Sequence, residues 1–189
     1  MSRLSVLVNR PRRTLAALAT VLVAVGITAA SGADFNATSA NADTTFATGT
    51  LTIENSKEAQ AIFASTSDMR PGDPARTGQV DIKNTGSLSG AFKLKRGSVT
   101  DSDSTYKLST KLNLVVKDCG NFSSGTPTCD VSDTDVYTGT ISAMSSDVAL
   151  GTFAAAEKHR YQFSVTVDTS ADNNYQGTNS VVPFSWTAS

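Results

Sequence analysis

Hydrophobic and polar residues alternate along much of this chain of 189 residues. The alternation is clearest in three runs, at residues 88–95, 111–117 and 160–167. A period of two residues places one side of a β-strand against a core and the other side in water. The three runs therefore predict β-strands that are half-buried.

Six further runs have a weaker strand pattern, at residues 45–53, 59–64, 78–83, 136–142, 148–153 and 181–188. Turn-forming residues separate them, for example Pro71-Gly72-Asp73 and Asn84-Thr85-Gly86. Pro183 lacks a backbone donor, so the last strand is expected to be an edge strand or to contain a bulge. About nine short strands and no long helix predict an all-β fold, an antiparallel β-sandwich.

The first 33 residues have a different composition. They contain four arginines and no acidic residue, and an apolar run at residues 15–30 leads to Ser31-Gly32-Ala33. A basic start, a short apolar run and an exit of small residues are typical of a secretory signal peptide, with cleavage expected between Ala33 and Asp34. A membrane-spanning helix needs roughly 20 apolar residues, so a retained anchor is the weaker alternative.

Cleavage would leave residues 34–189, which are enough for one domain with its own core. This mature chain keeps 12 of the 16 basic residues and all 17 acidic residues, so its formal net charge is −5. A secreted domain with this charge does not have the composition expected of a protein that binds nucleic acid. We therefore expect one secreted domain without a nucleic-acid partner.

Both cysteines, Cys119 and Cys129, belong to the mature chain. Gly, Ser, Thr, Pro and Asn fill most of the stretch between them, which predicts a loop. Two cysteines this close together in an exported chain are expected to form a disulfide. Metal binding by the pair is the alternative, but no neighbouring residues complete a ligand set.

Four segments resemble, in matching order, segments of the TasA/camelysin family of secreted bacterial proteins. They are Asp34-Phe35-Asn36 with Thr45-Phe46-Ala47-Thr48-Gly49-Thr50-Leu51, then Met69-Arg70-Pro71-Gly72-Asp73, then Asn84-Thr85-Gly86-Ser87-Leu88, and finally Asn174-Tyr175-Gln176-Gly177 with Phe184-Ser185-Trp186-Thr187-Ala188. Residues 98–146 show no clear match, and the cysteine loop departs from TasA. Turn and core residues dominate these segments, so we interpret them as fold-specifying, with Trp186 in the core.

The resemblance implies a jelly-roll-like β-sandwich that is exported and cut by a signal peptidase of the SipW type. TasA builds the fibres of a biofilm matrix, in which the N-terminal strand of one subunit fills a groove in the next. The resemblance places this donor region at residues 34–53. Its strand-forming part is Thr45, Phe46, Ala47, Thr48, Gly49, Thr50, Leu51, Thr52 and Ile53. Camelysin-like members have also been classed as metallopeptidases.

An enzymatic function finds little support in the residues. A zinc peptidase normally needs about three protein ligands and a general base. The single histidine, His159, stands at the start of a predicted strand, and Glu157 beside it would still leave the ligand set incomplete. We interpret His159 as a strand-end histidine, and the sequence assigns no catalytic, cofactor-binding or metal-binding residue.

Calcium is a weaker possibility for two acidic segments. Their carboxylates belong to Asp101 and Asp103, and to Asp130, Asp133 and Asp135. Neither segment has the spacing and glycine of an EF-hand loop, so we interpret both as solvated loops.

These observations predict a secreted structural protein of the extracellular matrix or cell surface. It would self-assemble into biofilm fibres by exchange of N-terminal strands between subunits. Its partners would be other copies of itself, other matrix or surface components, and the SipW-type peptidase that processes it. The alternatives are a camelysin-like secreted metalloendopeptidase and a monomeric cell-surface adhesion module.

Overall fold

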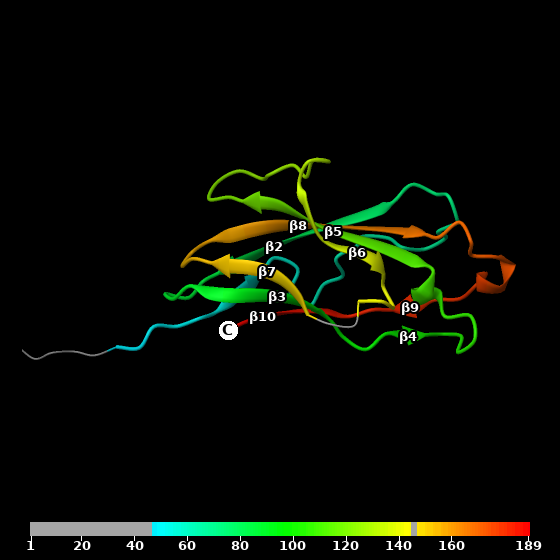
Figure 1. Ribbon diagram of the computed structural model, residues 1–189, viewed down its shortest axis with the longest axis horizontal. Helices are drawn as coiled ribbons and strands as arrows, with labels where there is room; N and C mark the ends of the chain where they lie inside the picture. The colour runs from blue at the N-terminus through cyan, green and yellow to red at the C-terminus, as the bar shows by residue number, and fades with distance from the viewer. Residues whose placement is uncertain (1–46, 145–146) are drawn as a thin grey trace, which may run out of the picture. The chain divides into compact units, whose positions relative to one another are not determined.

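The computed structural model describes residues 47–144 and 147–189, which form ten β-strands and two 3-10 helices (Figure 1). The strands are β1 (Ile53–Asn55), β2 (Arg76–Asn84), β3 (Gly90–Arg96), β4 (Thr100–Asp101), β5 (Leu112–Asn121), β6 (Thr134–Thr140), β7 (Val148–Phe153), β8 (Lys158–Val167), β9 (Ser180–Val181) and β10 (Phe184–Ala188). The predicted signal peptide, the cleavage site at Ala33 and Asp34, and the donor residues Thr45 and Phe46 lie outside the described residues. Among the residues described, no helix is long and apolar enough to cross a membrane.

The strands form two main antiparallel sheets and one small pair. One sheet has the order β1-β2-β8-β5-β6, the other has the order β10-β3-β7, and β4 pairs with β9. The chain passes from one main sheet to the other between β2 and β3, between β6 and β7, and between β7 and β8. Exchange of strands between two sheets is a feature of jelly-roll-like folds. The predicted all-β antiparallel fold class is confirmed.

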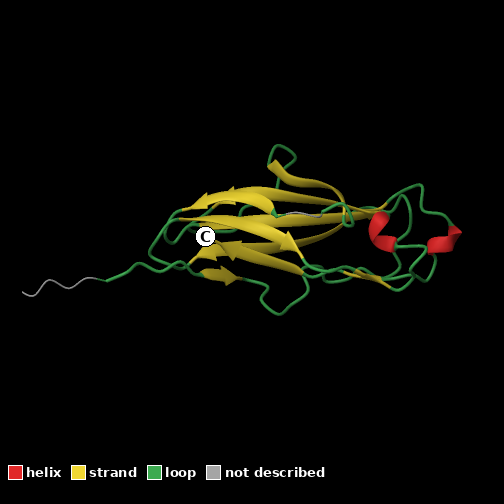
Figure 2. Cartoon of the chain, turned by 60° about the horizontal axis from the view of Figure 1, so that its bottom comes forward, coloured by secondary structure: helices red, strands yellow, loops and turns green. Residues whose placement is uncertain are grey.

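The core lies between the two main sheets, which Figure 2 shows as layers of strands. The ring of Phe163 on β8 lies 5.2 Å from the ring of Phe184 and 6.2 Å from that of Trp186, both on β10. The Trp186 ring is also 5.5 Å from that of Tyr161. Each large apolar side chain buried in this way contributes roughly 1.5–3 kcal/mol to stability. Trp186 is half-buried against the core, which agrees with its predicted packing role.

Seven of the nine predicted runs correspond closely to strands. The exceptions are residues 59–64 and the described residues 47–52 of the run at 45–53. The run at 181–188 is divided into β9 and β10 at Pro183, and β10 is an edge strand as the proline predicts. Residues 59–64 do not form a strand, because only Phe63 makes an isolated bridge, to Gly78. Ala59 there has a positive φ of 55°, which interrupts an extended chain. The two-residue strand β4 lies in a segment without a predicted strand.

The turn at Pro71-Gly72 has the geometry that its residues predict. Gly72 has a φ of +85°, and the N–H of Asp73 donates to the carbonyl of Arg70 over 3.1 Å. Proline followed by a glycine with positive φ is the pattern of a type II turn. The side chain of Asp73 also accepts the N–H of Arg70, so the turn is closed in both directions.

The turn after β2 depends on Asn84, whose side chain is fully buried. Its Nδ2 group donates to the carbonyls of Leu88 (2.7 Å), Ala154 (3.1 Å) and Phe153 (3.3 Å). Its Oδ1 atom accepts the N–H of Gly86 over 3.0 Å. A buried amide needs partners of this kind because leaving it unpaired is costly. Asn84 therefore joins the turn at 84–88 to the end of β7, a contact that would account for the interpretation of this motif as fold-specifying.

Candidate functional site

The free edge of β10 is the first feature that could support an interaction. Within residues 47–144 and 147–189, β10 pairs with β3 alone, and the backbone of Ser189 both donates to and accepts from that of Ala91. Backbone bonding alternates along an antiparallel strand, so Phe184, Trp186 and Ala188 direct their N–H and C=O groups to the free side. Natural edge strands are often protected by charged residues or proline within them, whereas β10 contains neither.

An open groove with a cavity volume of about 1450 Å³ lies beside this edge. Phe184 and Trp186 of β10 line it, together with Ile53 of β1 and with Ile62 and Phe63 of the segment that follows β1. Further apolar lining comes from Leu112, Val165 and Val167. Polar and charged residues, such as Asn55, Arg70 and Asp172, also line the groove. Apolar side chains in a groove, beside a row of backbone groups without partners among the described residues, are the two features that an added β-strand needs.

The N-terminal arm, residues 47–52, lies against its own domain. The carbonyl of Thr50 accepts the N–H groups of Ser87 (2.9 Å) and Leu88 (3.0 Å). Leu51 packs on Gly90, where a Cβ atom would lie only 2.7 Å from the methyl groups of Leu51. The predicted strand at 45–53 is therefore not formed over residues 47–52, because these residues bond to a turn instead of a strand. Among the described residues of this run, 47–53, Ile53 alone belongs to a strand, β1, where it lies opposite Asn84.

A second cluster surrounds His159 near the start of β8. The Nδ1 atom of His159 lies 3.0 Å from Oδ2 of Asp118, and its Nε2 atom lies 3.1 Å from Oε1 of Glu157. All three side chains are largely buried, with exposed fractions of 16%, 17% and 22%. The imidazole stacks on the ring of Phe153 at 4.4 Å. His159 lies within β8, in agreement with the predicted strand-end histidine.

The ionisable groups of this cluster shift one another's pKa. Burial alone lowers the pKa of His159, but hydrogen bonds to Asp118 and Glu157 outweigh it, so the pKa is raised. The pKa of Glu157 is lowered, first by the backbone N–H of Ala154 and then by His159. Burial and the nearby Asp118 carboxylate raise the pKa of Tyr161, whose buried hydroxyl has no hydrogen-bond partner among the described residues.

This geometry bears on the metallopeptidase alternative. The carboxylates of Asp118 and Glu157 lie on opposite nitrogens of the His159 ring. One metal ion bound to either nitrogen would therefore displace one carboxylate and could not readily reach the other. A zinc site of the usual kind needs ligands that converge on one point. In its present conformation the cluster suits a pair of hydrogen bonds better than a metal centre.

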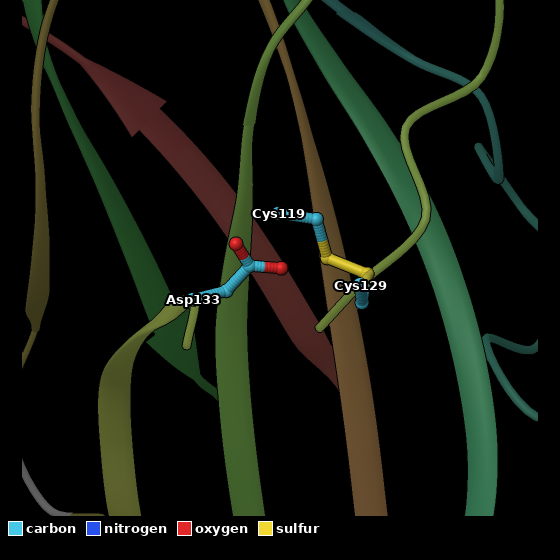
Figure 3. Close-up of side chains that lie close together, drawn as sticks. All are labelled: Cys119, Cys129 and Asp133. Carbon is cyan, nitrogen blue, oxygen red and sulfur yellow. A yellow bond between two sulfur atoms is a disulfide. The ribbon is translucent and has the colours of Figure 1, made fainter. Parts of the chain in front are cut away.

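The predicted bond between Cys119 and Cys129 is present and ties the end of β5 to the loop that follows it. Asp133 lies beside the two sulfur atoms (Figure 3), and the three groups are within 4.8 Å of one another. Metal ions bind the thiolate form of cysteine. The disulfide consumes both thiolates, so this group is a covalent cross-link with a carboxylate neighbour.

The acidic segments considered for calcium use their carboxylates locally. The carboxylate of Asp101 accepts the N–H and the hydroxyl of Ser109, and that of Asp103 accepts two backbone N–H groups, which lower its pKa. Asp133 accepts the N–H of Asp130, and Asp135 forms an ion pair with Lys117 at 2.6 Å. The interpretation as solvated loops holds for Asp103, Asp130 and Asp133, whereas Asp101 lies in β4 and Asp135 lies in β6.

Fold and site together define an antiparallel β-sandwich with one disulfide between described cysteines and a groove beside the edge strand β10. In comparisons with known proteins, no family model matches the chain and no curated protein matches it. The function must therefore be argued from the geometry.

Two parts of these sites were not found from the sequence. The groove forms from segments far apart in the chain, so no local motif indicates it. The sequence does contain a signal for Asp118, because this residue continues the alternate inward positions Leu112, Leu114 and Val116 of β5. A carboxylate at an apolar position of an alternating strand predicts a buried partner.

Proposed function

We propose that this protein is a secreted structural protein whose subunits join head to tail by β-augmentation. The observation that carries the proposal is the outer edge of β10, which has no strand partner in the described part of the chain, beside a groove with apolar side chains in its lining. An extended segment added to this edge would gain main-chain hydrogen bonds and bury alternate side chains. The resemblance to the TasA/camelysin family supports the same mode of assembly.

The proposed donor is the segment before residue 49 of a neighbouring subunit. Residues 50–53 are bonded to their own domain and would anchor the donor segment. Residues 34–46 could extend over roughly 43 Å, whereas the five residues of β10 cover roughly 17 Å. The donor segment is therefore long enough to reach along the edge, and Phe46 would supply an apolar side chain to the groove.

Addition of this kind does not close on itself, because the donor and the acceptor are different surfaces. Each subunit keeps a free groove at one end of the growing chain and a free arm at the other. Linear fibres in an extracellular matrix are the expected product. A secreted protein with a disulfide cross-link is suited to that environment.

The test is assembly of residues 34–189 at rising concentration, followed by light scattering and electron microscopy. We expect concentration-dependent fibres from the wild-type chain and monomers from a variant that lacks residues 34–43. Ala188→Pro should also block assembly, because it removes a backbone donor that faces the free side of β10. Ala188→Val is the matched control, since it changes the side chain but keeps the donor.

Two outcomes would contradict the proposal. A wild-type chain that stays monomeric at all concentrations would favour a monomeric surface module. Fibres that form equally well in Ala188→Pro and Ala188→Val would exclude β10 as the acceptor edge. Circular dichroism of each variant establishes that loss of assembly does not come from loss of the fold.

A further inference from the structure

The cluster around His159 contains more hydrogen-bond acceptors than a neutral histidine can satisfy. Both ring nitrogens lie 3.0–3.1 Å from carboxylate oxygens. A neutral imidazole carries one N–H, so it can donate to only one of the two carboxylates. The other carboxylate would then face the lone pair of the unprotonated ring nitrogen in a largely buried site. The geometry is satisfied only when the ring is protonated on both nitrogens.

Glu157 connects His159 to the turn between β7 and β8, residues 154–157. Its Oε2 atom accepts the N–H of Ala154 over 2.5 Å while its Oε1 atom faces His159. Ala156 in this turn has a φ of +66°, which is strained for a residue with a side chain. The conformation of the turn therefore depends on interactions that hold it. The Glu157 carboxylate supplies three of them, to the N–H of Ala154, to His159 and to the Nδ2 group of Asn121, which donates over 3.3 Å.

The same turn is bonded to the end of β2. The N–H of Asn84 donates to the carbonyl of Glu157 over 2.9 Å, and the N–H of Ala156 donates to the carbonyl of Asn84 over 3.0 Å. Asn84 is also the residue with which Ile53 pairs after the N-terminal arm. Glu157 is thus hydrogen-bonded directly to the residue that lies opposite Ile53, where the arm joins the domain.

We propose that Asp118, His159 and Glu157 form a pH-sensitive clamp, which holds the turn at 154–157 against Asn84 when His159 is charged and loosens when it becomes neutral. The groups that face His159 are Asp118 on β5 and Glu157 in the turn. Phe153 on β7 stacks on the ring, Ile82 on β2 is its apolar strand partner, and Tyr161 follows it on β8 with an un-ionised hydroxyl.

The direction of the pH dependence follows from the two carboxylates. They raise the pKa of His159 in the folded protein above its value in the unfolded chain. The clamp therefore gives its full stabilisation of the folded state below the ordinary histidine pKa of about 6.5. This stabilisation is lost as the pH rises through the raised pKa. The lowered pKa of Glu157 keeps that carboxylate charged throughout this range.

The experiment uses NMR on residues 34–189 at a concentration where the chain is monomeric, so it is independent of assembly. The chain has one histidine, so the imidazole signals belong to His159 without further assignment. We expect His159 to titrate above about 6.5. The hydrogen-exchange protection factors of the Asn84 and Ala156 amides, corrected for intrinsic rates, should fall as the pH passes that titration.

Glu157→Gln separates the clamp from other pH effects. A glutamine can still accept the N–H of Ala154 and can donate to the Nε2 lone pair of a neutral ring, so the cluster is satisfied without the second proton. We expect the pKa of His159 to fall and the protection of Asn84 to lose its pH dependence. Glu58→Gln is the matched control, since Glu58 is exposed and carries the same charge.

A wild-type His159 that titrates at or below about 6.5 would overturn the proposal, and this measurement decides alone if the variant does not fold. An identical pH dependence of protection in the wild type and in Glu157→Gln would overturn it as well. A flattened dependence in Glu157→Gln, with the Glu58→Gln control unchanged, would support it.

Discussion

Replacement of Asn84 by alanine should destabilise the domain more than its size suggests. The side chain is fully buried and makes four hydrogen-bond contacts, three as donor and one as acceptor. Its two N–H groups and one accepted bond are each worth roughly 1 kcal/mol net, and unpaired buried partners add to the loss. We therefore expect a cost of about 3–5 kcal/mol, a large part of the roughly 5–15 kcal/mol that stabilises a domain.

Thermal unfolding followed by circular dichroism measures this cost. At about 2–4 °C per kcal/mol for a chain of this size, Asn84→Ala should unfold about 10 °C below the wild type. Asn84→Asp keeps the volume and the acceptor but loses the donors, so it should cost at least as much. Asn113→Ala is the control, because Asn113 makes one side-chain bond, to Asp168, and should cost about 1 kcal/mol or less.

The reasoning would be refuted if Asn84→Ala unfolded at the same temperature as Asn113→Ala. That result would mean that the turn at 84–88 forms without the buried amide. The carbonyls of Leu88, Phe153 and Ala154 would then have other partners, and the motif would not be the element that specifies this end of the fold.

Two further predictions concern the cross-link and the histidine. The double variant Cys119→Ala, Cys129→Ala should lose about 2–3 kcal/mol of unfolding free energy, because the disulfide closes a short loop of ten residues' separation. Reduced wild-type protein should unfold at the same temperature as this variant. An unfolding temperature that does not change on reduction would contradict the prediction. Calorimetric titration of the mature chain with zinc should show no stoichiometric binding at His159, because both ring nitrogens face carboxylates. Tight binding that disappears in His159→Ala would instead favour the metallopeptidase.

The sequence was most informative where structure depends on neighbours along the chain. The alternation at 160–167 predicted β8, and that at 111–117 predicted most of β5, because a period of two is a local property of a strand. Pro71-Gly72 predicted its turn for a similar reason, since proline and glycine set φ by themselves. The disulfide was also predictable, because both cysteines flank one short loop.

Local pattern misled where a partner strand was required. Residues 59–64 have strand character, but only Phe63 reaches Gly78, and Ile62 packs against that glycine without a ladder. The arm at 47–52 likewise bonds to a turn, although its residues alternate in the manner of a strand. A strand forms only where a second strand runs alongside it at hydrogen-bond distance. A single stretch of sequence does not contain that information.

The sequence by itself determined the fold class, most of the strands, the turns and the cross-link. The tertiary structure decided which edge strand borders the groove, which residues line that groove, and which carboxylates face His159. The groove joins residues from β1, β8 and β10, and the histidine cluster joins Asp118 to Glu157. These contacts connect positions far apart in the chain, so they depend on how the two sheets pack and not on any local period of hydrophobic residues.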